Sequence, residues 1–185
     1  MKFVDCLIQQ CRIRKVVPYL KVGMRVLDIG CADGALFRLV PDLLDGVGID
    51  PNLTERSNVG SNVLLPGMFP EALPDNRPFD AVTLLAVLEH MPPAPQERLA
   101  HDINRSLAAG GHLLITVPSP AADRVLTVLK TLRLIHGMSL EQHYGYRVEQ
   151  TPALFRAAGL VLVARSRFQL GLNNLFIFRK PTVER

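Results

Sequence analysis

Short apolar runs alternate along the chain with longer stretches in which apolar residues recur at helical spacing. This alternation predicts an α/β domain with a mainly parallel sheet. Seven runs have the composition and length typical of strands: Arg25–Ile29, Gly46–Ile49, Asn62–Leu65, Phe79–Leu85, His112–Val117, Val161–Phe168 and Asn173–Phe178. Only residues 169–172 join the last two, which suits a hairpin, so the final strand is expected to run antiparallel to its neighbours.

Helices are expected before, between and after these strands, at residues 5–20, Ala35–Leu44, Gln96–Leu107 and Ala153–Ala158. The pattern is clearest in Gln96–Leu107, where Leu99 and Ile103 recur at helical spacing. The run Ala109-Gly110-Gly111 is expected to end that helix. The length of 185 residues suits one domain over residues 1–185, a three-layer fold with helices on both faces of the sheet.

Residues 119–150 interrupt the alternation and are too long for a simple connection. They begin with an apolar helical pattern at 125–135 and continue into the polar, aromatic stretch His143–Arg147. We expect a cap-like insertion that covers the carboxyl edge of the sheet. The apolar stripe fits core packing, a dimer surface or the wall of an apolar pocket, and the pattern does not choose among them.

Composition narrows the class of protein. The net charge is +4, but no block of Lys and Arg marks a nucleic-acid tract, so no nucleic-acid partner is expected. No apolar run approaches the ~20 residues that span a bilayer, and no signal peptide is evident, so we expect a cytoplasmic protein without a membrane span. The three cysteines and five histidines lack the spacing of a disulfide framework or a metal site.

The turn after the first strand reads Asp28-x-Gly30-x-x-x-Gly34. This spacing departs from the G-x-G-x-x-G of dinucleotide-binding turns. It also places Asp28 and Asp33 where they would repel a pyrophosphate and favour a ligand with ammonium and sulfonium groups. Asp50, at the end of the second strand, is suited to accept hydrogen bonds from a ribose diol, or is simply a turn residue before Pro51.

Four segments carry a family resemblance: VLDIGCADG (26–34), GIDP (48–51), FDAVTLLAVLEHM (79–91) and LAAGGHLLITVPS (107–119). In this order and spacing the chain resembles the class I S-adenosylmethionine-dependent methyltransferases, of the small type-11 or type-23 kind. The resemblance covers Val26–Ser119, and FRAAGL (155–160) with the two strands after it also fits. It implies a Rossmann-like αβα fold with a seven-stranded, mostly parallel sheet, and S-adenosylmethionine as cofactor without a metal.

The resemblance also implies a role for individual positions. Those that would contact the cofactor are Asp28, Gly30, Cys31 and Gly34 at its amino-acid end, Asp50 at the ribose, Pro51 at the adenine, and Leu85 and Ala86 at the methionine moiety. Ala32 stands where the family often has glycine, which the turn tolerates if φ is negative. Met68 stands where the family commonly has an acid, so the adenine is expected to pack against Met68 and Phe69.

Two other acids, Glu71 and Asp75, could replace the missing acid at the adenine only if their loop folds back. Cys31 has no histidine beside it in the sequence, so a small packing side chain is favoured over a nucleophile there.

Four residues are candidates for acid–base or orienting work near the acceptor: Glu89, His90, His143 and Tyr146. Each has a structural alternative. The pair Glu89-His90 could only orient the loop before Pro92, His143 could lie on the surface, and Tyr146 could pack.

The expected reaction is methyl transfer to a small, partly apolar acceptor, at oxygen rather than nitrogen or carbon, by a monomer or homodimer. The alternative is a catalytically silent methyltransferase-like partner or regulatory subunit, and a nucleotide-dependent oxidoreductase is disfavoured by the turn.

Overall fold

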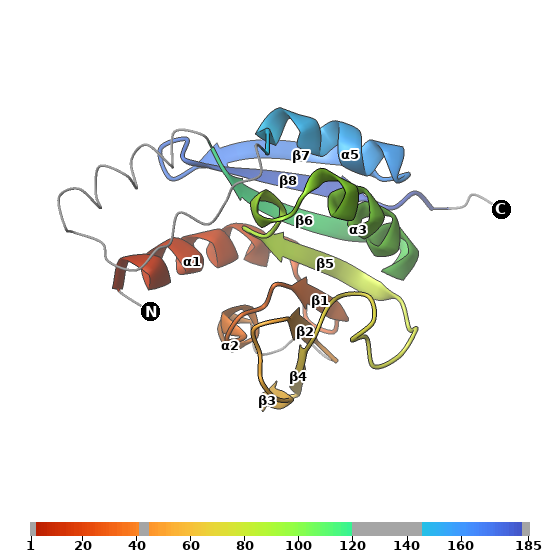
Figure 1. Ribbon diagram of the computed structural model, residues 1–185. Coiled ribbons are helices and arrows are strands. Elements are labelled where there is room, and N and C mark those ends of the chain that lie inside the picture. Colours follow the sequence, from red (N-terminus) through yellow and green to blue (C-terminus); the bar gives the residue numbers. More distant parts are fainter. Residues whose placement is uncertain (1–2, 41–44, 120–145, 183–185) are drawn as a thin grey trace.

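The computed structural model describes residues 3–40, 45–119 and 146–182. The strands of this part of the chain form one eight-stranded sheet in the order β3-β4-β2-β1-β5-β6-β8-β7 (Figure 1). They are β1 (Val26–Ile29), β2 (Val47–Asp50), β3 (Ser57–Val59), β4 (Asn62–Pro66), β5 (Phe79–Leu85), β6 (Leu107–Pro118), β7 (Val161–Phe168) and β8 (Asn173–Arg179).

The sheet confirms the predicted fold class. Strands β4, β2, β1, β5 and β6 pair in parallel. The last strand, β8, lies between β6 and β7 and is antiparallel to both, as the hairpin predicted. The sheet has eight strands rather than seven because Ser57–Val59 turns at Gly60 and pairs antiparallel with β4. This short strand is mostly exposed, so no apolar run marks it in the sequence.

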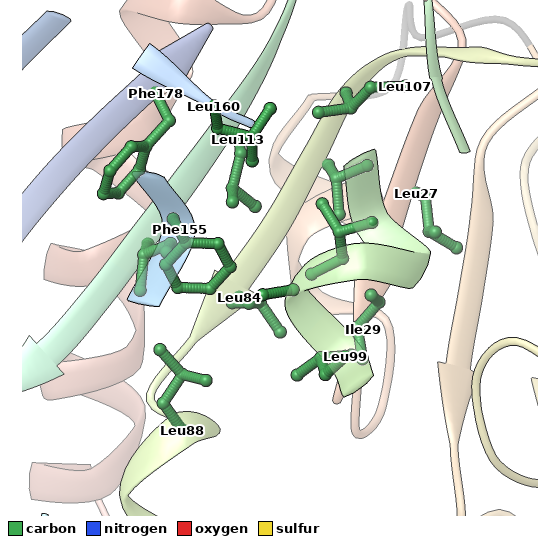
Figure 2. Close-up of a cluster of buried hydrophobic side chains, with 14 of the residues drawn as sticks. Leu27, Ile29, Leu84, Leu88, Leu99, Leu107, Leu113, Phe155, Leu160 and Phe178 are labelled. Carbon is green, nitrogen blue, oxygen red and sulfur yellow. The ribbon is translucent and has the colours of Figure 1, made fainter. Parts of the chain in front are cut away.

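Helices cover both faces of the sheet and make the expected three layers (Figure 1). Helices α1 (Phe3–Val16) and α2 (Ala35–Leu39) lie on one face, and α3 (Pro93–Ser106) and α5 (Thr151–Ala157) on the other. One buried cluster joins α1 and α2 to the sheet, and a second joins α3 and α5 to it. Figure 2 shows the second cluster, where Leu99 of α3 and Phe155 of α5 lie near Leu84 of β5.

The join between α3 and β6 differs from the sequence prediction. The helix ends at Ser106, and Leu107 is already extended as the first residue of β6. Gly110, at φ +78°, therefore lies inside the strand rather than at a helix end. Lys180 stabilises the join, because its Nζ donates to the carbonyl oxygens of Asn104 (2.6 Å) and Leu107 (2.7 Å).

Most of the insertion expected at 119–150, including His143, lies outside the described residues. Within 146–150, residues Val148–Gln150 form a short 3-10 helix, η3, that leads into α5. Among the helices that the structure describes, none combines the length and apolar character needed to cross a membrane.

Asn62 is predicted to be the main polar anchor of the β3–β4 hairpin. Its buried side chain accepts from the Gly46 amide (3.0 Å) and donates to the Val59 carbonyl (3.1 Å). Asn62→Ala leaves both groups unsatisfied, so we expect a loss of about 2–3 kcal/mol in unfolding free energy, measured by urea titration. Asn58→Ala, on the exposed part of β3, is the control and should change stability by less than about 0.5 kcal/mol.

Candidate functional site

The site lies at the carboxyl edge of the sheet, where β2, β1 and β5 are neighbours. The chain leaves β1 toward β2 on one side and later returns to β5 on the other side. This reversal of strand order opens a crevice between the turns in α/β proteins, and ligands bind there. The turns predicted from the sequence to bind a cofactor therefore meet at one place.

The turn after β1 depends on its glycines. Gly30 has φ +77°, and its amide donates to the Ile49 carbonyl at 2.8 Å. A Cβ on Gly30 would lie 2.5 Å from Cγ2 of Val87, so the turn after β5 packs directly against it. Gly34 has φ +75°, and a Cβ there would lie 2.8 Å from Leu64 Cδ1. Both positions therefore require glycine, for conformation and for space.

Ala32 does not meet the condition of a negative φ under which the turn tolerates alanine without strain, because it has φ +47°. This left-handed conformation costs an alanine roughly 1–2 kcal/mol. The turn is held there by a hydrogen bond from the Ala32 amide to Oδ2 of Asp50, at 2.8 Å. Ala86, directly after β5, is also left-handed (φ +62°), and its amide donates to the Thr116 carbonyl at 2.9 Å. Two strained alanines therefore lie in the turns after β1 and β5.

Asp50 links the turns after β1 and β2. Besides accepting from Ala32, its carboxylate accepts from the Asn52 amide through Oδ1, at 2.8 Å. The side chain is buried, whereas Pro51 and Asn52 beyond it are exposed. A carboxylate oxygen has a second lone pair, so both oxygens keep capacity for a further donor such as a ribose hydroxyl.

Asp28 is buried under the same turn. Its Oδ1 accepts a 2.6 Å hydrogen bond from the Thr83 hydroxyl of β5. Burial raises the pKa of Asp28 to about 7, the hydrogen bond from Thr83 partly offsets this, and the charge of Asp50 raises the pKa further. A cation bound in the crevice would favour the ionised form.

Asp33 does not share this environment. Its side chain is 52% exposed and pairs with Arg38, which also donates to the Asp33 carbonyl at 2.6 Å. The acidic character that the sequence assigned to Asp28 and Asp33 therefore comes instead from Asp28 and Asp50.

The side chain of Cys31 has a packing role. The thiol is buried against Gly48 of β2, where a Cβ would lie 2.7 Å from Cys31 Sγ. Burial, with the nearby charges of Asp28, Asp50 and Asp33, raises the pKa of the thiol far above its ordinary value, and a hydrogen bond from the Cys31 backbone only partly offsets this. The thiol therefore stays protonated and is no nucleophile.

The turn after β4 carries Met68 and Phe69. Met68 is 57% exposed, and Phe69 is half-buried against the cluster beneath α3. The Gly67 amide donates to the Asp50 carbonyl at 3.3 Å, which brings this turn beside the end of β2. Met68 therefore offers an apolar surface next to the predicted ribose position.

The two acids considered as substitutes at the adenine lie elsewhere. Asp75 pairs with Arg25 at 2.9 Å, and Arg25 precedes β1 at the amino edge of the sheet. Glu71 and Asp75 line one hollow, of about 460 Å³, together with residues of α3. Neither carboxylate replaces the missing acid.

On the acceptor side, β5 ends at Leu85 and continues into the 3-10 helix η2 (Leu88–His90). Glu89 is buried, and its Oε1 lies 4.0 Å from Nε2 of His90, whose side chain is 37% exposed. The two candidates therefore differ: Glu89 points inward and His90 lies at the surface.

Tyr146 is tied into the start of α5. Thr151 Oγ1 donates to the Val148 carbonyl at 2.8 Å, so the hydrogen bond between Tyr146 and Thr151 is donated by the phenol. Burial, and less strongly the charges of Glu89 and Glu149, raise the pKa of Tyr146 to about 12. Tyr146 is therefore neutral at physiological pH and suited to orienting rather than to accepting a proton.

Three polar residues near this edge were not predicted from the sequence as site residues: Arg12 of α1, Thr83 of β5 and Thr116 of β6. Thr83 and Thr116 each stand as a polar residue inside an apolar strand, a signal that the sequence does contain. Arg12 gives no such signal, because only the folding of α1 against the sheet brings it to the edge. Among the described residues, no group of His, Cys, Asp and Glu could hold a metal ion.

Comparison with known proteins identifies the family. A family model for a methyltransferase domain, of type 23, matches residues 5–165. The chain therefore belongs to this methyltransferase family, as its motifs indicated. No curated protein sequence matches it.

Solved methyltransferases share the fold. A chain of the Haloferax volcanii complex between the Trm112 methyltransferase activator and a methyltransferase has a TM-score of 0.68 and 16% identity, over 96% of this chain and 92% of that one. The N-methyltransferase NodS of Bradyrhizobium japonicum has a TM-score of 0.65 and 17% identity, over 96% and 98%. The magnesium protoporphyrin IX methyltransferase of Synechocystis, solved with bound S-adenosylhomocysteine, has 0.67 and 15%, over 97% and 88%. At these identities the likeness shows the class I methyltransferase fold.

Ala32→Gly is predicted to stabilise the protein. Glycine adopts the positive φ of this position without the clash that an alanine Cβ makes, so we expect a gain of about 0.5–1 kcal/mol in unfolding free energy. Chemical denaturation measures it. Ala35→Gly, at the first position of helix α2, is the matched control and should lose about 0.5–1 kcal/mol, since glycine loses more backbone entropy on folding than alanine. Loss of stability in Ala32→Gly would contradict the assignment of strain.

The raised pKa of Asp28 predicts a pH dependence of stability. The folded protein holds this proton up to about pH 7, whereas the unfolded chain releases it near the ordinary value of 3.8. The contribution of Asp28 is therefore complete below about pH 4 and is lost as the pH rises toward 7.

We expect Asp28→Asn to be more stable than the wild type at pH 7.5, by roughly 1–4 kcal/mol, with the difference vanishing near pH 4. Urea titrations across this range measure it. Asp33→Asn, at an exposed position of the same turn, is the control and should show no such trend. A constant difference between Asp28→Asn and the wild type from pH 4 to 7.5 would refute the prediction.

Proposed function

We propose that this protein transfers the methyl group of S-adenosylmethionine to a small, partly apolar acceptor, with oxygen as the preferred atom. The observation that carries the proposal is the pair of buried carboxylates, Asp28 and Asp50, beneath a glycine turn at the point where the strand order reverses. A pyrophosphate would be repelled there, whereas a ligand with a sulfonium, an ammonium and a ribose is favoured.

Each part of such a cofactor would have its own contacting residues at this edge. Asp50 would accept from the ribose hydroxyls through the lone pairs that Ala32 and Asn52 leave. Met68 and Phe69 would pack against the adenine, and Asp28 with the turn at Gly30 would hold the amino-acid end. Leu85 and Ala86, at the end of β5, would border the methionine moiety.

When bound, the cofactor supplies an electrophilic methyl group, and the protein's task is to position the acceptor and exclude water. Glu89 lies inward beyond the end of β5, on the acceptor side of the proposed cofactor position. Its carboxylate would take the proton of an acceptor hydroxyl as that oxygen bonds to the methyl carbon and the sulfonium leaves as a thioether. This step is the reason that oxygen is preferred.

The remaining candidates have lesser roles in this proposal. Tyr146 holds the start of α5 against the site and orients rather than titrates, because its pKa is about 12. His90 is at the surface beside Glu89 and would modulate it by charge. His143 stays a candidate for contact with the acceptor from the insertion.

The second candidate function is a catalytically silent methyltransferase-like subunit that acts through a partner protein. The observation that favours it is Met68, an exposed apolar side chain where the family commonly has an acid. The Haloferax complex pairs a methyltransferase with a partner protein, its activator. Cofactor binding separates the two functions, because a silent subunit has no need of it.

The test is calorimetric titration with S-adenosylhomocysteine, with NADH as the comparison ligand. We expect binding of S-adenosylhomocysteine alone. Asp50→Ala should weaken it by about 1.5–3 kcal/mol, since a charged hydrogen-bonding partner is lost together with the anchor of the Ala32 turn. Asp80→Ala, an acid at the amino edge whose Oδ2 accepts from the Arg25 amide, is the control and should leave the affinity unchanged.

Binding of NADH alone would overturn the proposal. Absence of binding at ~1 mM S-adenosylhomocysteine would favour the silent subunit.

A further inference from the structure

We propose that Arg12 binds a carboxylate group of the methyl acceptor, so that the substrate is a small acid with an apolar body. This inference rests on the proposed function and adds the chemical class of the acceptor. It is carried by the position of Arg12, by the hydrogen bonds that its guanidinium lacks, and by the buried hydroxyl of Thr116 on the same side of the sheet.

Arg12 is placed at the carboxyl edge by the packing of α1. Its neighbours Ile13 and Val16 are buried against the sheet, which fixes the rotation of the helix. Arg12 Nε donates to Oδ1 of Asn173 at 3.3 Å, and the amide of Asn173 in turn donates to Gln169. Asn173 begins β8 opposite Pro118, the last residue of β6, so the guanidinium lies where β6 ends.

The hydrogen-bond donors of the Arg12 guanidinium are only partly used. It carries five N–H donors, and among the described residues it finds one acceptor, Asn173 Oδ1. Burial lowers the pKa of Arg12, and the negative charge of Glu89 opposes that shift without cancelling it. A guanidinium remains charged under these conditions, and a desolvated charge with unused donors is the usual environment for binding an anion.

A buried hydroxyl group on β6 is consistent with the same ligand. Thr116 is fully buried, and its Oγ1 has no hydrogen-bond partner among the described residues. The side chains of Thr116 and Leu114 lie on one face of β6 by strand alternation, and Leu114 belongs to the cluster beneath α1. Thr116 therefore faces the side of the sheet on which Arg12 lies, and buried hydroxyls of this kind require a partner.

The strand register relates Thr116 to the proposed position of the methionine moiety. Thr116 lies directly opposite Leu85, which ends β5 beside the proposed methionine position, and adjacent strands are about 5 Å apart. An acceptor held at Arg12 and Thr116 would thus place atoms only a few bonds from its carboxylate near the methyl group. The acceptor is accordingly compact.

A carboxylate fits better than a phosphate. Arg12 is one guanidinium, and Glu89 acts on it with a negative charge, so a dianion would meet repulsion that a monoanion meets only in part. The planar guanidinium also matches a carboxylate with two parallel hydrogen bonds. Leu85, which ends β5 and is partly buried against the cluster beneath α1, would accommodate an apolar body.

The experiment uses benzoate and benzamide as probes, which share an apolar ring and differ in charge. Each is titrated by calorimetry into the protein saturated with S-adenosylhomocysteine. We expect benzoate to bind at least about tenfold more tightly than benzamide, since a charged hydrogen-bonded pair is present only with the acid. Arg12→Gln should weaken benzoate about ten- to hundredfold and abolish the preference, while Arg12→Lys should retain part of it.

Arg14→Gln is the matched control, because Arg14 is an exposed arginine on the same helix that lines a separate hollow with Lys15. It should leave benzoate binding unchanged, and every variant should bind S-adenosylhomocysteine as the wild type does. Equal binding of the two probes, no binding of benzoate, unchanged binding in Arg12→Gln, or an equal loss in Arg14→Gln would each overturn the proposal. Displacement of benzoate by equimolar inorganic phosphate would contradict the choice of carboxylate.

A failure of the proposed function would be distinguishable from a failure of this inference. If the wild type does not bind S-adenosylhomocysteine, the cofactor assignment is wrong, and the same probes titrated into the unliganded protein still decide whether Arg12 selects an acid.

Discussion

The hydrogen bonds of the Asp50 carboxylate hold the carboxyl edge together. One oxygen accepts from the Ala32 amide in the turn after β1, and the other accepts from the Asn52 amide in the turn after β2. Through the first bond Asp50 keeps Ala32 in a left-handed conformation that alanine otherwise avoids. The turn is therefore set before any ligand arrives, which lowers the cost of ordering it on binding.

Charge divides this edge into two parts. Under the turns of β1 and β2 lie the buried carboxylates Asp28 and Asp50, and at the end of β6 and the start of β8 lies the guanidinium of Arg12. The arrangement suits a cationic cofactor beside an anionic acceptor, each held by groups of opposite charge. Keeping Asp28 out of water costs stability at neutral pH, as its raised pKa shows, and such costs are typical of functional sites.

Much of the fold could be read from local pattern, and the exceptions have identifiable causes. Phe79–Leu85 and Val161–Phe168 were predicted with their observed bounds, because Pro78 precedes the first run and Gly159 and Gly171 lie near the two ends of the second. Strand β3 was missed because Ser57–Val59 is short and exposed, and the start of β6 was missed because Gly110 and Gly111 suggested a helix end. In the site, the glycine turn and Asp50 were predicted from motif spacing.

The sequence by itself determined the order of strands and helices, the glycine turn and the family, because these depend on residue type and on spacing along the chain. Only the tertiary structure decided which charges share the site. In the folded chain, Asp75 lies at the opposite edge of the sheet, and Asp33 is exposed beside Arg38. Arg12 of α1 contacts Asn173 at the start of the last strand. Local pattern does not encode such long-range contacts, since they follow from how α1 and the loops pack against a completed sheet.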